Sequence, residues 1–207
     1  MKKNFYTRNY FFGLSIAIFI MSLIAFSDNM ITDVHQESNS NPFMIIHGLI
    51  MFSWTIVLII QTNHIRKLNI AQHKKFGIIG FVIAIFMLLS INYLAYMGPD
   101  FVDLPFFGKA NRLFVPAFAL VLLFAYLKRQ NSVLHQYFIF TGMLLCLEPI
   151  LSRFCGNLGL NPVHLAFPIW LGLWLSLFLY DIISRRKLHP ILYLGFIFFL
   201  GVYVVVS

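Results

Sequence analysis

The chain has 207 residues, of which 60% are hydrophobic and only 11% are charged, and its mean hydropathy is +0.83. Because a soluble domain carries about 25% charged residues to cover its surface, this composition excludes a soluble fold and predicts an all-α bundle in a lipid bilayer. The net charge of +8 does not indicate nucleic acid as a partner, since the basic residues are confined to short connections between apolar runs.

Seven apolar stretches predict seven membrane-spanning helices, because each is near the length of about 20 residues that crosses the hydrocarbon layer. The first, Tyr10–Phe26, follows a basic start and resembles a signal peptide with a cleavage site near Ala25 and Ser27. We interpret it as an uncleaved span, with cleavage as the alternative. The other six stretches are Phe43–Gln61, Phe76–Met97, Leu113–Leu127, Val133–Leu151, Val163–Tyr180 and Pro190–Val206.

These stretches predict one transmembrane domain over residues 1–207. A leading helix at 10–27 is followed by three hairpins, at 42–97, 108–153 and 162–206. Asn41-Pro42 and Asn161-Pro162 each place an N-cap residue and a first-turn proline at a helix start.

The basic residues alternate between the two sides of the predicted bundle. Twelve of the 15 fall on the side of the N-terminus, and the other three are Lys109, Arg112 and Arg153. Short cytoplasmic loops are enriched in Lys and Arg, so this pattern predicts a cytoplasmic N-terminus and, with seven spans, an external C-terminus.

Ionisable and amide side chains inside the predicted spans fall at a common depth near the outer face. Glu148 precedes Pro149, which has no N–H to give to the carbonyl of Leu145 and therefore predicts a kink. A carboxylate at this depth either protonates or finds a cation. We predict an outer polar pocket that binds a ligand and is formed by His47, Asn92, Arg112, Glu148 and Arg153.

Structural roles are the alternative for the same side chains. Glu148 can pair with Arg112 or Arg153 and lock two helices together. Arg153, nearer the interface, can instead extend into the lipid headgroups. His47 can form a hydrogen bond to a neighbouring helix.

A second layer of polar side chains falls near the inner face. Asp181 can pair with Arg185 one helical turn later, which is a structural role. His73 and His135 open the third and fifth helices at the same depth, and two facing histidines can supply both axial ligands of a haem iron. Haem b is therefore a candidate cofactor, and a place among the lipid headgroups is the alternative for both histidines.

Two stretches of the chain have a familiar order of residues. The first holds His47-Gly48, Trp54, Gln61 and His73-Lys74-Lys75-Phe76-Gly77, and the second holds Arg112, Lys128-Arg129, His135 and Arg153. Over residues 41–154 this order resembles a family of bacterial multi-pass membrane proteins known only as a membrane domain of unknown function. The resemblance implies a bacterial inner-membrane protein, supplies no activity, and marks His47, His73, Arg112, His135 and Arg153 as positions of interest.

The arrangement is also loosely similar to the two-haem b-type cytochromes. Those proteins need histidines on facing helices at two depths, whereas the fourth predicted helix here has none. The similarity is therefore compatible with one bound haem rather than two.

Three functions fit these features. The first is binding or transport of a small solute or ion, with Glu148 as the proton- or cation-responsive group and Arg112 as partner of Glu148 or of an anionic substrate. The second is a membrane redox protein that holds haem through His73 and His135 and exchanges electrons with quinone. The third is an accessory protein that holds a membrane protein partner and does no chemistry. The sequence contains no phosphate-binding loop, HExxH motif or Ser/His/Asp pattern.

Overall fold

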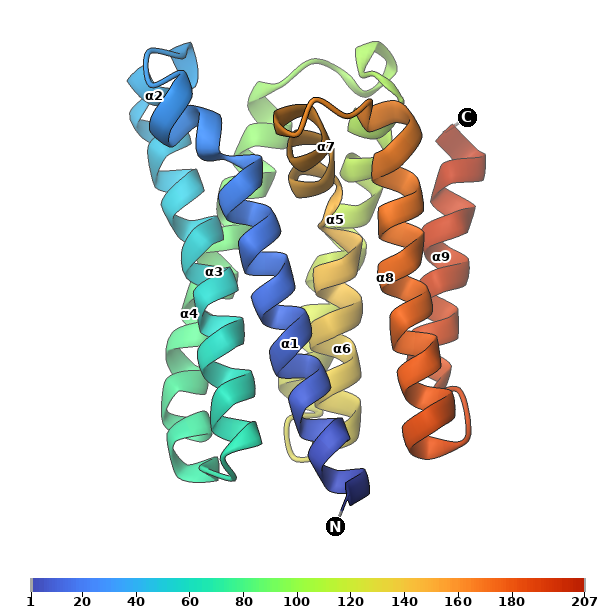
Figure 1. The fold of residues 1–207 in the computed structure, drawn as a ribbon. Helices are drawn as coiled ribbons and strands as arrows, with labels where there is room; N and C mark the ends of the chain where they lie inside the picture. The colour runs from blue at the N-terminus through green and yellow to red at the C-terminus, as the bar shows by residue number, and fades with distance from the viewer. Residues whose placement is uncertain (1, 207) are drawn as a thin grey trace. The chain divides into compact units, whose positions relative to one another are not determined.

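A computed structural model describes residues 2–206 of the chain, with side chains from Asn9 onward. The described residues form helices and no β-strand, which confirms the all-α class (Figure 1). In chain order the elements are α1 (Lys2–Ala25), η1 (Asp28–Thr32), α2 (Glu37–Ser40), α3 (Pro42–Arg66), α4 (Ile70–Met97), η2 (Phe101–Asp103), α5 (Phe106–Leu127), α6 (Ser132–Leu145), α7 (Glu148–Asn157), α8 (Pro162–Arg185) and α9 (Pro190–Val206).

Asparagine side chains fix the start of three helices. The side-chain oxygen of Asn41 accepts hydrogen bonds from the N–H groups of Phe43 and Met44, and Asn161 accepts one from Val163 at 2.9 Å. Both helices begin at the proline that follows the cap, as the sequence predicts. Asn131 caps α6 in the same way.

The fifth predicted stretch is two helices rather than one kinked helix. α6 ends at Leu145, α7 begins at Glu148, and the two helix axes meet at 51°. Pro149 is the second residue of α7, where its missing N–H would have no intrahelical partner anyway. The proline is thus placed at the start of a new helix, and the chain changes direction just before it.

Four helices, α3, α4, α5 and α8, are long and apolar enough to cross a membrane, and the bent pair α6–α7 makes five if it counts as one span. The apolar segments Asn9–Ala25 and Pro190–Val206 are shorter. Seventeen helical residues extend about 26 Å, somewhat less than the ~30 Å of a typical hydrocarbon core. The chain is therefore a multi-pass helical protein, and the total of seven spans stays a prediction.

The chain forms two compact units by the contacts between its helices. The first unit comprises residues 1–90 and 150–165, and the second comprises residues 91–149 and 166–207. α4, α7 and α8 each contribute residues to both units.

In the first unit α1 packs against α3 (Figure 1). α1 buries Phe11 and Ile18, and α3 buries Trp54 and Leu58. α4 approaches α3 closely at Gly80, where a Cβ atom would lie 2.9 Å from the side chain of Val57. A small residue at this point lets the two helices come together.

In the second unit α5 packs against α6 and α9, and α8 joins them through its two tryptophans. Trp170 and Trp174 are fully buried among aromatic side chains of α5 and α9, including Phe114 and Phe199. Their bulk fills the centre of this unit.

Many large apolar side chains are exposed on the helices. Ile78 on α4 is 70% exposed, Leu49 on α3 is 64% exposed, and Ile197 on α9 is 61% exposed. Water would disfavour apolar surface of this extent, whereas lipid tails accept it without cost. These faces indicate contact with a lipid bilayer.

Candidate functional site

Glu148 lies at the break between α6 and α7 and is only 6% exposed. One of its carboxylate oxygens accepts a hydrogen bond from the side-chain amide of Asn111 on α5, at 2.6 Å. Both residues belong to the second unit. A buried carboxylate at a helix break is the type of group that binds cations inside membrane proteins.

The break also leaves backbone carbonyls at the end of α6. The N–H groups of Cys146 and Leu147 turn back to the carbonyls of Met143 and Leu144, at 3.2 and 3.4 Å. The Leu144 carbonyl accepts a second, shorter hydrogen bond of 2.6 Å from the indole N–H of Trp170. Trp170 thus stabilises non-helical backbone within the apolar unit.

Aromatic side chains surround this region of the second unit. Tyr203 on α9 lies 5.0 to 5.3 Å, between ring centroids, from Phe106, Phe167 and Phe199. Its phenolic oxygen is buried, has no hydrogen-bond partner among the described residues, and interacts electrostatically with Glu148. Glu148, Asn111 and Tyr203 therefore form a small set of oxygen-bearing groups in apolar surroundings, which we call the Glu148 site.

Arg112 directly follows Asn111 on α5, so its side chain is turned by about 100° about the helix axis. Its Nη2 donates a hydrogen bond to the carbonyl oxygen of Pro99 at 2.7 Å, in the connection after α4. Asn92, another predicted pocket residue of this unit, is exposed on α4. Asn111, which the structure places on Glu148, was missing from the predicted pocket although it directly precedes Arg112 in the sequence.

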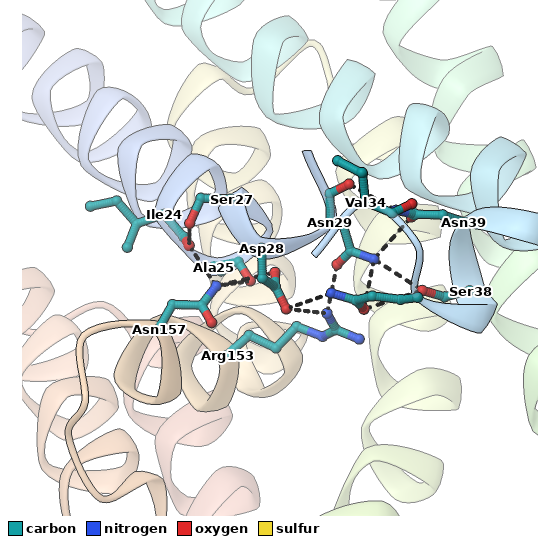
Figure 2. Close-up of polar contacts among 11 residues, drawn as sticks. Ile24, Ala25, Ser27, Asp28, Asn29, Val34, Ser38, Asn39, Arg153 and Asn157 are labelled. Atoms are coloured by element: carbon teal, nitrogen blue, oxygen red, sulfur yellow. Dashed lines mark hydrogen bonds and ion pairs between the residues drawn. The ribbon is translucent and has the colours of Figure 1, made fainter. Parts of the chain in front are cut away.

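Arg153 belongs to the first unit and contacts the segment that follows α1 (Figure 2). Its Nη1 lies 3.8 Å from a carboxylate oxygen of Asp28 and donates a hydrogen bond to Asn29 at 2.9 Å. The guanidinium also lies 5.0 Å from the ring centroid of Phe26. Arg153 is 41% exposed, so these contacts hold η1 in place near the surface.

Asn157, one turn after Arg153, completes this contact (Figure 2). Its side-chain amide donates to the carbonyls of Ile24 and Ala25 and to the carboxylate of Asp28, at 3.0 to 3.2 Å. Burial alone would raise the pKa of the Asp28 carboxyl, but hydrogen bonds from Asn157 and Gln36, a backbone N–H and the charge of Arg153 hold that pKa below its usual value.

His47 forms a hydrogen bond to a neighbouring helix, which is the predicted structural alternative to a role in the outer pocket. Its Nδ1 lies 3.0 Å from the hydroxyl of Ser90 on α4. Because that hydroxyl donates to the carbonyl of Met87 at 2.9 Å, it accepts from Nδ1–H of His47.

The two histidines of the haem prediction lie in different units. His135 on α6 donates Nδ1–H to the carbonyl of Ala125 at 2.8 Å. His73 begins the third predicted span in the first unit and is half-buried. Within the described part of the chain, no three His, Cys, Asp or Glu side chains are grouped to hold a metal ion. Haem b needs only two axial ligands, and its binding by His73 and His135 stays a prediction.

A second buried acid lies at the other end of the second unit. The Asp181 carboxylate is fully buried, accepts hydrogen bonds from the hydroxyl of Tyr137 and from the backbone N–H of His189, and pairs with Arg185 at 3.8 Å. The His189 ring stacks on Tyr137 with centroids 4.4 Å apart. The predicted pair of Asp181 with Arg185 is confirmed, and Tyr137 and His189 join it.

Comparison with protein-family models, with curated proteins and with solved structures finds no match to this chain. The resemblance to the bacterial membrane-domain family therefore stays a prediction from the residues quoted above.

Proposed function

We propose that this chain is a bacterial inner-membrane protein of seven spans that binds and transports a small monovalent cation at the Glu148 site. Its N-terminus is cytoplasmic, and the site lies toward the external face. The observation that carries this proposal is the burial of the Glu148 carboxylate at the break between α6 and α7, beside Asn111.

The chemistry of the site favours a monovalent cation. A single carboxylate carries one negative charge, which one bound monovalent ion neutralises within an apolar unit. The other oxygen atoms available as cation ligands are the amide oxygen of Asn111, the phenol oxygen of Tyr203 and the backbone carbonyls at the end of α6. Membrane proteins use such oxygens, and the carbonyl ends of broken helices, to replace the water shell of Na⁺ and K⁺.

The charges at the two ends of the second unit support the orientation. The connection between α5 and α6 carries Lys128 and Arg129, and the connection after α8 carries Arg186 and Lys187. Asp100 and Asp103 lie in the connection at the other end of α5. Asn111, near that same end of α5, donates the hydrogen bond to Glu148. The positive-inside rule then places the Glu148 site on the external side.

Titration calorimetry of the purified protein in detergent tests the site, with NaCl and KCl as probes against choline chloride. We expect saturable binding of at least one of the two cations, and a loss of at least tenfold in affinity in Glu148→Gln. The matched control is Glu37→Gln, because Glu37 is the other glutamate of the chain and is exposed. Absence of binding in the wild type, or equal cation affinity in Glu148→Gln and Glu37→Gln, contradicts the proposal.

The haem and accessory hypotheses remain open beside this proposal. A visible spectrum of the purified protein, reduced and oxidised, decides the first, since a haem protein shows a Soret band.

A further inference from the structure

The segment between α1 and α3 is closed into a compact turn by its own polar side chains (Figure 2). The side-chain nitrogen of Asn29 lies 2.9 to 3.1 Å from oxygen atoms of Gln36, Ser38 and Asn39, to which its N–H groups donate. The side-chain amide of Asn39 donates to the backbone carbonyls of Asn29 and Val34, at 2.8 and 2.9 Å. Asn29, Gln36, Ser38 and Asn39 are half-buried as a result.

The carboxylate of Asp28 joins this turn to α7. It accepts a hydrogen bond from the side-chain amide of Gln36 at 3.1 Å and another from Asn157 at 3.2 Å, and it pairs with Arg153. All of these residues belong to the first unit. The polar side chains that form the turn therefore find their partners within the protein.

Large apolar side chains of the same turn are exposed instead. Ile31 is 76% exposed, Met30 is 52% exposed, and Val34 is exposed as well. Water favours the reverse arrangement, with apolar side chains inside and amides outside. The other exposed side chains between Asp28 and Ser38 are polar, namely Thr32, Asp33, His35 and Glu37. A segment with an inner polar network and both apolar and polar side chains at its surface fits the boundary between lipid tails and headgroups.

The turn directly follows a helix that is short for a membrane span. The apolar part of α1, Asn9–Ala25, extends about 26 Å, whereas a typical hydrocarbon core is ~30 Å thick. Ile20 and Leu23 near the end of α1 are exposed in the same way as Met30 and Ile31. The exposed apolar side chains of α1 are thus followed along the chain by those of the turn.

Lipid fits this surface better than a protein partner does. Binding energy at protein interfaces is concentrated in Trp, Tyr and Arg side chains that fill pockets of the partner. The exposed apolar side chains of the turn are Met30, Ile31 and Val34, which are flexible or small. Acyl chains are fluid and accept such side chains without a matching shape.

We propose that residues 28–34 insert into the lipid leaflet at this end of α1, with Met30, Ile31 and Val34 among the acyl chains below the headgroups. In the proposed orientation this is the external leaflet. The insertion is shallow, about 5–10 Å, as for other interfacial segments. It extends the apolar surface beyond Ala25 and compensates for the short helix. This surface is separate from the Glu148 site and does not depend on it.

Electron paramagnetic resonance of a nitroxide label at Ile31→Cys tests the insertion. The full chain, with Cys146 and Cys155 replaced by serine, is reconstituted into vesicles of phosphatidylcholine and phosphatidylglycerol. Oxygen, which concentrates in lipid, and a nickel chelate, which stays in water, are the two relaxing reagents. We expect the nickel chelate to collide with this label about tenfold less often than with a label in water, because hydrocarbon excludes polar solutes. Oxygen should collide with it more often.

The matched control is Ser40→Cys, because Ser40 is exposed in α2 of the same connection and should contact water. Met30→Cys is a second test position, and both test positions lie outside the polar network that closes the turn. Equal access of the nickel chelate to Ile31→Cys and Ser40→Cys would place the turn in water and overturn the proposal. Protection of Ile31→Cys from both reagents would also overturn it, by showing that protein, such as a second copy of the chain, covers the turn.

Discussion

Arg153 on α7 pairs with Asp28 on η1, with 3.8 Å between Nη1 and Oδ2 (Figure 2). The two residues are far apart in the sequence, and their contact fixes the end of α1 against α7 within the first unit. Asn157 strengthens the contact by donating to two backbone carbonyls at the end of α1. These carbonyls belong to the last turn of α1, and the Ile24 carbonyl also accepts a hydrogen bond from the hydroxyl of Ser27 at 2.8 Å.

We expect Asn157→Ala to destabilise the first unit more than Arg153→Ala. Loss of Asn157 removes its hydrogen bonds to the Ala25 carbonyl and to the Ile24 carbonyl and should cost about 1–2 kcal/mol. The ion pair is partly exposed, so loss of the Arg153 charge should cost less than about 1 kcal/mol. Thermal melts in detergent, followed by circular dichroism, measure the order. An equal or reversed order would show that the ion pair dominates.

Gly195→Ala should destabilise the protein by about 1–3 kcal/mol, because the new Cβ overlaps Cγ2 of Thr141 at 2.6 Å. Thr141→Ser removes that methyl group, so the double variant should recover much of the loss. Gly201→Ala is the control, since nothing lies within 4 Å of a Cβ at that position. Strictly additive effects of Gly195→Ala and Thr141→Ser in thermal melts would contradict the packing of Thr141 against Gly195.

Acid should destabilise the protein through His189. Burial lowers the pKa of His189, as do the charges of Arg185 and Lys187, although Asp181 opposes them. The unfolded chain therefore binds this proton more readily, and stability falls as the pH falls through 6.5 toward the folded pKa. The melting temperature of the wild type should fall between pH 7.5 and 5.5 by more than that of His189→Gln. Parallel falls in both proteins would show that another group is responsible.

The loops at the two ends of α5 should lie on opposite sides of the membrane. Val102 is 76% exposed in η2, and Gln130 is exposed in the basic connection after α5. In a background with Cys146 and Cys155 replaced by serine, Val102→Cys should react with an impermeant maleimide on intact cells. Gln130→Cys should react only after permeabilisation. Reaction of both on intact cells would overturn the topology.

Local features were predictable from the sequence because they depend on residues close together in the chain. Apolar runs of membrane length gave the helices, and Asn41 and Asn161 gave two of their starts. The pair of Asp181 and Arg185 follows from their spacing of one helical turn.

The partners of the outer polar residues were not predictable, because they depend on how each helix is rotated about its axis. One residue position turns a side chain by about 100°, which is why Asn111 rather than Arg112 is the hydrogen-bond partner found on Glu148. Arg153 was assigned to lipid headgroups or to Glu148, whereas it pairs with Asp28. The feature of the sequence that indicates a partner for Arg153 is the number of acidic and amide residues in the segment after α1, from Asp28 to Asn39.

The most direct measurement of the cation site is infrared difference spectroscopy of the carboxylates. The chain has two glutamates, Glu37 and Glu148, so glutamate labelled with ¹³C at the side-chain carboxyl marks only these positions. Addition of the bound cation should shift a labelled carboxylate band that persists in Glu37→Gln and is absent in Glu148→Gln. A shift that survives in Glu148→Gln, or no labelled band in the wild type at saturating cation, would contradict the account.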